Sequence, residues 1–116
     1  PGWHKFDRAM IAPLVSEGKI VFVDVTADWC LTCKANKKFV LDRADMKRTL
    51  STDNIVRMQA DWTQKDEDIA EYLRGFGRYG IPFNVVYGPN APDGIPLPEL
   101  LSKEAVLNAL TEAAGE

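Results

Sequence analysis

The stretch TADWCLTCK at residues 26–34 holds both cysteines of this 116-residue chain, three positions apart. The apolar run at residues 20–25 precedes it and predicts a buried strand. Residues 34–41 follow it without glycine or proline, which favours a helix. We therefore expect the C-x-x-C pair, Cys30 and Cys33, at the point where a strand turns into a helix.

That position favours thiol chemistry. Only a thiolate attacks a disulfide, and near neutral pH a free cysteine is mostly thiol. The unpaired N–H groups and the dipole at a helix N-terminus stabilise the anion, and in such motifs the pKa of the first thiol falls from about 8.5 to about 7 or below. We expect Cys30 to be the first helical residue and the exposed nucleophile. Cys33, one turn later, would resolve a mixed disulfide.

A C-x-x-C pair has two other interpretations, a structural metal site and a static structural disulfide. A structural metal site needs about four ligands, and the chain offers no second cysteine pair and a single histidine, His4. A static structural disulfide would close a loop too short to remove much chain entropy. The residues favour redox exchange over both.

Several segments resemble a known family. The segment from Phe22 to Lys34 resembles the active site of thioredoxin-fold proteins, with Trp29 before the first cysteine and Asp24 six positions before it. Later segments resemble the C-terminal periplasmic domain of DsbD-type transmembrane disulfide reductases, and within that group the ScsB-like branch, which is associated with copper tolerance. These segments are ADWT at 60–63, FGRYGIP at 76–82 and LPELL at 97–101. The resemblance extends over roughly residues 7–113.

The resemblance implies an α/β architecture, the thioredoxin-like fold, with a central mixed β-sheet flanked by helices on both faces. The order of the predicted elements is helix, strand, helix, strand, helix, strand, strand, helix, which suits such a sheet. The length allows one hydrophobic core. We expect a single domain over residues 1–116, with residues 1–5 as a loose lead-in.

The resemblance also implies roles for residues around the cysteines. In the thioredoxin fold a proline at the position of Pro82 is cis and lies against the C-x-x-C, which implies a cis Ile81–Pro82 bond and substrate contacts from Trp29, Ile81 and Pro82. An ionised carboxylate at Asp24 is costly to bury. Asp24 is therefore either satisfied or edge-exposed, or it is a carboxyl of raised pKa that relays the proton of Cys33, as the resemblance implies.

Local signals give further expectations. Pro13 is expected to kink or break the first helix. Thr63 can cap the amphipathic helix that follows it, and Ser102 can cap the last helix. The turn formers at 88–94 predict a reversal into an antiparallel strand over 95–100.

The direction of electron flow follows in part from the dipeptide between the cysteines. Leu31 and Thr32 add no charge or ring donor to hold the Cys30 thiolate, so we expect a potential nearer about −270 mV than about −120 mV, and hence a reductase. The resemblance implies that electrons come from a membrane-embedded domain of the same polypeptide and pass to periplasmic thiol proteins. Several relatives carry a carboxylate where this chain has Asn36 and Lys37, and a cation there would lower the cysteine pKa values.

Bulk properties bound the partners. The net charge of −3 and pI near 5.2 argue against nucleic acid. No apolar run approaches about 18 residues and no signal peptide is visible. Because the chain starts at Pro1, we interpret it as an excised or processed piece. The resemblance implies a periplasmic location, tethered to the inner membrane in the full-length protein. We expect a monomer with no cofactor beyond the redox-active disulfide.

Two rival functions are a copper- or zinc-binding module using the C-x-x-C and a free-standing cytosolic thioredoxin. For a metal module, only Met10, Met46 and Met58 could add soft ligands. None is near the cysteines in the sequence, and single methionines in apolar patterns are usually core.

Overall fold

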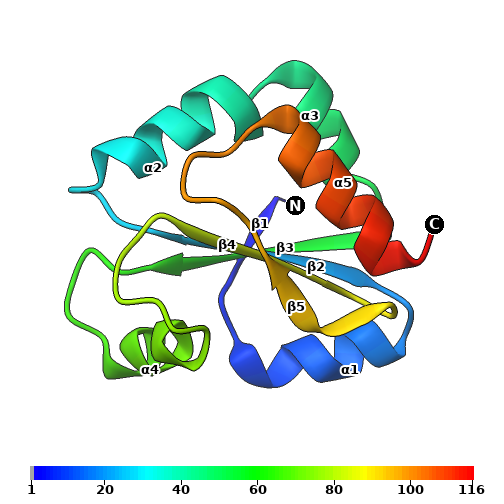
Figure 1. The fold of residues 1–116 in the computed structure, drawn as a ribbon, viewed down its shortest axis with the longest axis horizontal. Helices are drawn as coiled ribbons and strands as arrows, with labels where there is room; N and C mark the ends of the chain where they lie inside the picture. Colours follow the sequence, from blue (N-terminus) through cyan, green and yellow to red (C-terminus); the bar gives the residue numbers. More distant parts are fainter. Residues whose placement is uncertain (1) are drawn as a thin grey trace.

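Five strands form one mixed sheet in the order β1-β3-β2-β4-β5 (Figure 1). The structure is a computed structural model that describes residues 2–116. Strand β2 lies at the centre, parallel to β3 and antiparallel to β4. The strands are β1 (Trp3–Lys5), β2 (Ile20–Thr26), β3 (Ile55–Asp61), β4 (Phe83–Gly88) and β5 (Ala91–Pro96).

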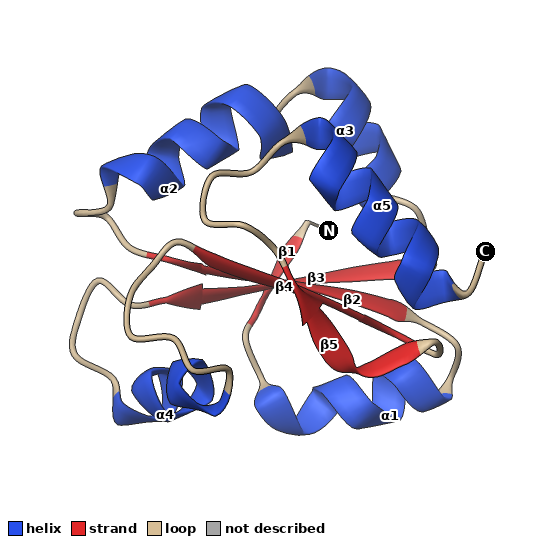
Figure 2. Cartoon of the chain, in the orientation of Figure 1, coloured by secondary structure: helices blue, strands red, loops and turns tan. Residues whose placement is uncertain are grey.

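Helices cover both faces of this sheet (Figure 2), which confirms the predicted architecture. Helices α1 and α4 lie on one face, whereas α2, α3 and α5 lie on the other. A 3-10 turn, Arg8–Met10, leads into α1, and a π-helical turn, Lys37–Leu41, continues α2. The helices are α1 (Ile11–Ser16), α2 (Leu31–Asn36), α3 (Ala44–Leu50), α4 (Glu67–Gly75) and α5 (Lys103–Ala114).

Strand β2 is buried along its whole length because helices cover both of its faces. Side chains alternate along a strand. Val21, Val23 and Val25 pack with the core beneath α1 and α4, whereas Phe22 packs with Val40 and its neighbours beneath the α2 side. By the same alternation, Asp24 faces the α2 side of the sheet.

The expectation of a loose lead-in at residues 1–5 is wrong for residues 3–5, and Pro1 lies outside the described residues. Residues 3–5 form β1, which pairs in parallel with β3. Trp3 contacts Phe22 edge-on at 6.0 Å between ring centroids, and the Arg57 guanidinium lies over the Trp3 ring at 5.7 Å from its centroid. A three-residue edge strand carries little local signal, because its hydrogen bonds come from a strand much later in the chain.

Pro13 does not break the first helix, contrary to the prediction, because α1 continues across it from Ile11 to Ser16. Regular helix begins only at Ile11, after the 3-10 turn. Pro13 therefore lies in the first turn of α1, where a backbone N–H has no intrahelical partner to lose.

One of the two predicted caps is wrong. Thr63 does not cap α4, because Asp66 does, accepting hydrogen bonds from the N–H groups of Asp68 at 2.9 Å and Ile69 at 3.1 Å. Ser102 caps α5 as predicted, accepting from the N–H of Ala105 at 3.1 Å.

The last strand begins earlier than predicted. The chain reverses at Pro89 and Asn90, and β5 spans Ala91–Pro96 rather than 95–100. Turn formers such as Pro92 are tolerated in β5 because it is an edge strand, in which a missing N–H need not cost a hydrogen bond to a neighbour.

Candidate active site

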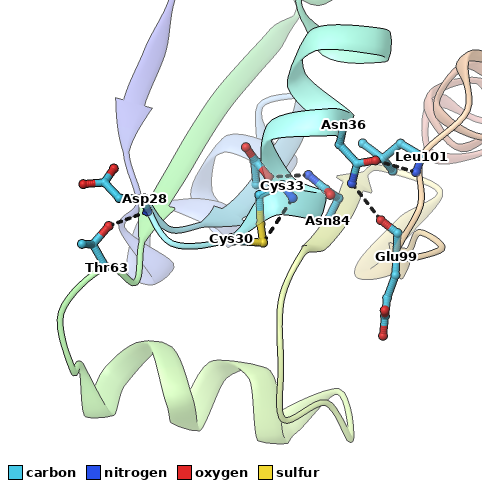
Figure 3. The surroundings of a disulfide bond; sticks show 9 residues. Asp28, Cys30, Cys33, Asn36, Thr63, Asn84, Glu99 and Leu101 are labelled. Atoms are coloured by element: carbon cyan, nitrogen blue, oxygen red, sulfur yellow. Dashed lines mark hydrogen bonds between the residues drawn. A yellow bond between two sulfur atoms is a disulfide. The ribbon is translucent and has the colours of Figure 1, made fainter.

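The cysteines lie at the strand-to-helix junction that the sequence predicts. Strand β2 ends at Thr26, and α2 begins at Leu31 (Figure 3). Cys30 is the N-cap rather than the first helical residue, and it forms a disulfide with Cys33. The Cys30 sulfur accepts a hydrogen bond from the Cys33 N–H at 3.1 Å. The N-terminus of α2 thus donates an N–H to the sulfur of Cys30, the predicted nucleophile.

Both cysteines are buried in this disulfide form. Cys30 is 6% exposed and Cys33 is 3% exposed, so the expectation of an exposed Cys30 is wrong for the oxidised chain. Ala27 forms a small cluster with both cysteines, and the side chain of Ile81 packs against it. Ile81, brought in from the loop before β4, therefore covers the disulfide.

Asp24 is buried, which excludes the edge-exposed alternative. Asn84, its cross-strand partner on β4, donates a hydrogen bond from Nδ2 to the Asp24 Oδ1 at 2.8 Å. Burial raises the pKa of Asp24, while the Asn84 hydrogen bond and the Lys37 charge act against that rise. The direction of this shift agrees with the predicted raised pKa of Asp24. The role of Asp24 in proton transfer stays a prediction.

The loop before β4 has the predicted cis bond between Ile81 and Pro82. Trp29 and Ile81 line a groove of ≈ 520 Å³ next to the disulfide cluster, whereas Pro82 is buried and is not among the lining residues. Trp29 is 60% exposed and Tyr79 is 79% exposed, so the groove presents aromatic surface to solvent. The remaining lining residues are Trp62, Thr63, Gln64, Lys65 and Gly80.

A larger hollow, of ≈ 700 Å³, lies between β1 and α4. Its lining includes Lys5, Arg8, Asp66 and Glu71, but neither cysteine and no residue of the groove beside the disulfide. The larger hollow is therefore not the candidate active site, because the cysteines do not line it.

Sequence reasoning missed the contact that orients the loop before the cysteines. The Thr63 hydroxyl accepts a hydrogen bond from the Asp28 N–H at 2.9 Å, and the Thr63 carbonyl accepts one from the Trp29 indole at 3.3 Å. The same hydroxyl donates to Asp61 at 2.5 Å. No local pattern reveals this contact, because it joins two loops that follow different strands.

Asn36, where relatives were expected to carry a carboxylate, has a structural contact. It is 3% exposed, donates to the Glu99 carbonyl at 2.8 Å and accepts from the Leu101 N–H at 3.0 Å. Figure 3 shows it joining α2 to the segment before α5. The neighbouring Lys37 is half-buried and lowers the pKa of Asp24.

Within residues 2–116, no group of three or more histidine, cysteine, aspartate or glutamate side chains is arranged to hold a metal ion. Met46 and Met58 are core residues, as predicted, whereas Met10 is 45% exposed and is not. None of the described helices has both the length and the apolar character to cross a membrane.

Comparison with known proteins agrees with this geometry. A family model described as thioredoxin-like matches residues 2–89. The thiol:disulfide interchange protein DsbD of Colwellia psychrerythraea is 40% identical over 67 residues, which are 57% of this chain and 11% of that protein. DsbD of Yersinia pestis is 34% identical over 67 residues, 58% of this chain and 11% of that protein. The chain thus spans only a small part of these curated relatives.

Solved structures show the same fold. The oxidised C-terminal domain of Neisseria meningitidis DsbD superposes with a TM-score of 0.69 at 22% identity, covering 91% of each chain. A thioredoxin from Thermus thermophilus gives a TM-score of 0.67 at 22% identity, covering 98% of this chain and 92% of that one. Together with the family model, these matches confirm the predicted thioredoxin-like fold.

Proposed function

The chain belongs to the thioredoxin-like family, and on that premise we propose that it is a thiol:disulfide oxidoreductase that acts as a protein-disulfide reductase. One observation carries the proposal, the Cys30–Cys33 disulfide at the N-terminus of α2. The curated relatives are named thiol:disulfide interchange proteins, which supports this reaction class.

The reaction begins with the reduced chain. The Cys30 thiolate attacks one sulfur of a partner disulfide, so that a bond forms between Cys30 and that sulfur while the partner's own S–S bond breaks. The second partner sulfur leaves with the electron pair and takes up a proton. The helix N-terminus favours the attacking thiolate, because its N–H groups and dipole stabilise negative charge there.

Cys33 then resolves the mixed disulfide. Its proton passes to the Asp24 carboxylate, and its thiolate attacks the Cys30 sulfur. The Cys30–Cys33 bond forms, the bond to the partner breaks, and the partner sulfur leaves as a thiolate that is then protonated. Two electrons have moved from the two cysteines to the partner. Asp24 later releases the Cys33 proton to solvent, and the two partner thiolates take their protons from solvent.

The partner is held in the groove beside the cysteines. Trp29 and Ile81 line this groove, and the backbone before Pro82 lies at the start of β4, where an extended partner segment can pair with it. Trp29 and Ile81 are thus the proposed side-chain contacts with the substrate, and the predicted contact at Pro82, whose side chain is buried, would be made through the backbone that precedes it.

The likeness to DsbD proteins supports a place for the reaction. We propose that this domain receives electrons from a membrane-embedded domain of the same full-length polypeptide and passes them to periplasmic thiol proteins. The domain would then lie in the periplasm, tethered to the inner membrane. Because the chain resembles the ScsB-like branch, we also propose that this electron transfer is linked to copper tolerance.

The reduction potential of the Cys30–Cys33 pair tests the direction of electron flow. The chain is equilibrated in glutathione or dithiothreitol buffers, and its free thiols are trapped and counted. We expect a midpoint near that of thioredoxin, about −270 mV. A midpoint above about −180 mV would contradict the reductase assignment.

A trapping experiment tests the order of the two cysteines. Cys33→Ala should accumulate a mixed disulfide with a partner through Cys30, because no thiol remains to release it. Cys30→Ala is the matched control and should accumulate little. Equal trapping by both variants would contradict the assigned roles.

A further inference from the structure

Asn84 is a carboxamide in a strand that is otherwise apolar. Strand β4 reads FNVVYG, every residue of it is buried, and Asn84 is 1% exposed. Burying an amide is costly unless its polar atoms find hydrogen-bond partners. The partners of Asn84 therefore indicate why the position holds an amide.

The principal partner is the Asp24 carboxyl. Asn84 lies directly opposite Asp24 in the antiparallel pairing of β4 with β2. Its Nδ2 donates to Asp24 Oδ1 at 2.8 Å and lies 3.5 Å from the Val23 carbonyl oxygen. Among the described residues, nothing hydrogen-bonds to Asp24 Oδ2, although this oxygen is buried. The two carboxyl oxygens thus differ, because only Oδ1 accepts a hydrogen bond in this geometry, although the Gln59 side chain, opposite Asp24 on β3, also stabilises the carboxylate.

Asp24 and Asn84 lie on the face of the sheet that α2 covers. Asp24 shares its strand face with Phe22, which packs with Val40 and Leu41 of the turn that continues α2. In Figure 3 the Asn84 side chain points toward the start of α2, where the cysteines lie.

We infer that Asn84 is a positioning residue for disulfide exchange, holding Oδ1 of Asp24 so that Oδ2 is the oxygen that takes the Cys33 proton. The inference deepens the proposed function and rests on it, since Asn84 acts only through Asp24. A neutral carboxyl carries one proton, and with Oδ1 accepting an N–H that proton belongs on Oδ2. As the Cys33 sulfur attacks Cys30, its proton moves to Oδ2, and the partner sulfur leaves with the electrons of the broken bond.

Asn84 also influences the pH at which Asp24 can accept that proton. Burial raises the pKa of Asp24, and the Asn84 hydrogen bond opposes this by stabilising the carboxylate. The other groups that act on Asp24 are Lys37 and the Gln59 amide, which lower the pKa, and Asp42, which raises it. Removing the Asn84 donor should therefore raise the pKa further and delay ionisation of Asp24 to higher pH.

The experiment follows the reduced chain as it reacts with a symmetrical aromatic disulfide that releases one coloured thiolate per bond broken. The first release reports attack by Cys30, and the second reports resolution by Cys33. The second rate, measured against pH, should rise along an acid limb as Asp24 ionises. In Asn84→Leu that limb should move to higher pH by about one unit, the size expected for one lost hydrogen bond to a charged group.

Further variants separate positioning from a general loss of structure. Asn84→Thr retains a hydroxyl donor, so its acid limb should lie between those of the parent chain and Asn84→Leu. Asp24→Asn should remove the limb, and adding Asn84→Leu to Asp24→Asn should change nothing further. The matched control is Asn36→Leu, the same change at a buried asparagine that contacts Glu99 and Leu101 instead. It should lower stability but leave the limb in place.

An unmoved limb in Asn84→Leu would overturn the inference, as would a shift by Asn84→Leu that persists in the Asp24→Asn background. If Asn84→Leu does not fold, nuclear magnetic resonance of the parent chain decides, because the Asn84 amide protons should titrate with the midpoint of the limb. Asn84 amide signals that do not shift over this pH range would overturn the inference. Loss of the first coloured phase in the parent chain would overturn the proposed function itself, and the inference with it.

Discussion

The Thr63 hydroxyl accepts a hydrogen bond from the backbone N–H of Asp28 at 2.9 Å, across a separation of 35 residues. Thr63 follows β3, whereas Asp28 lies in the loop between β2 and the cysteines. The Thr63 carbonyl also accepts from the Trp29 indole. The loop that carries the cysteines is thus fixed to its neighbouring loop as well as to α2.

Thr63→Val should loosen this loop. Valine has the shape of threonine but cannot accept from Asp28 or donate to Asp61, so we expect a loss of about 1 kcal/mol in the free energy of unfolding. Trp29 should become more mobile. Urea denaturation measures the loss of stability. Fluorescence anisotropy of Trp29, in a chain in which Trp3 and Trp62 are replaced by phenylalanine, measures its mobility.

The control for this prediction is Thr52→Val. The Thr52 hydroxyl bonds only the nearby Thr49 carbonyl, at 3.2 Å on the surface. We expect a change within about 0.5 kcal/mol. Similar losses in both variants would count against a special role of Thr63.

Asp24→Asn should stabilise the oxidised chain at neutral pH. Burial raises the pKa of Asp24 above its ordinary value of 3.8, so the folded chain binds this proton more tightly than the unfolded chain. The stability from Asp24 is fully present below pH 3.8 and is lost as the pH rises through the raised, folded pKa. Asparagine does not ionise and escapes this loss. Urea denaturation from acid to neutral pH should show the two stabilities diverging as the pH rises; parallel curves would contradict the prediction.

Asn36→Ala should destabilise the chain by about 2–4 kcal/mol, because two hydrogen bonds are lost and the Leu101 N–H is left buried without a partner. Denaturant unfolding measures this. Asn90→Ala is the control, because Asn90 is exposed and its amide makes one side-chain bond, to the Glu112 carbonyl at 3.1 Å. We expect about 1 kcal/mol or less there. Equal losses would show that the Asn36 bridge is unimportant.

Gly88→Ala should cost about 2 kcal/mol or more. A Cβ added at Gly88 would lie 2.8 Å from the carbonyl carbon of Ala113 and 2.7 Å from the Ile20 side chain, so α5 would have to move away from β4. Gly80→Ala is the control, because an added Cβ there meets no atom within 4 Å. Its unfolding free energy should change by less than about 0.5 kcal/mol. Thermal or urea unfolding of both variants decides.

The elements that the sequence predicts well are those set by neighbours along the chain. The apolar run at 20–25 becomes the central strand because both faces of β2 are buried. Ser102 caps α5, because capping uses N–H groups two or three positions away. The C-x-x-C itself fixed the position of the site in the same way, since it follows β2 directly. The cap of α4, by contrast, is Asp66 and not the predicted Thr63.

The contacts that complete the site are decided by the tertiary structure. The Asp24–Asn84 bond spans 60 residues, and the bond from Asn36 to Glu99 spans 63. β1 also exists only because β3 offers it an open edge. Such contacts depend on which strands become neighbours, and no local periodicity contains that information. The sequence by itself determined which atoms react and where the helix presents them. The tertiary structure decided which side chains support them, because those residues come together only when the strands of the sheet have paired.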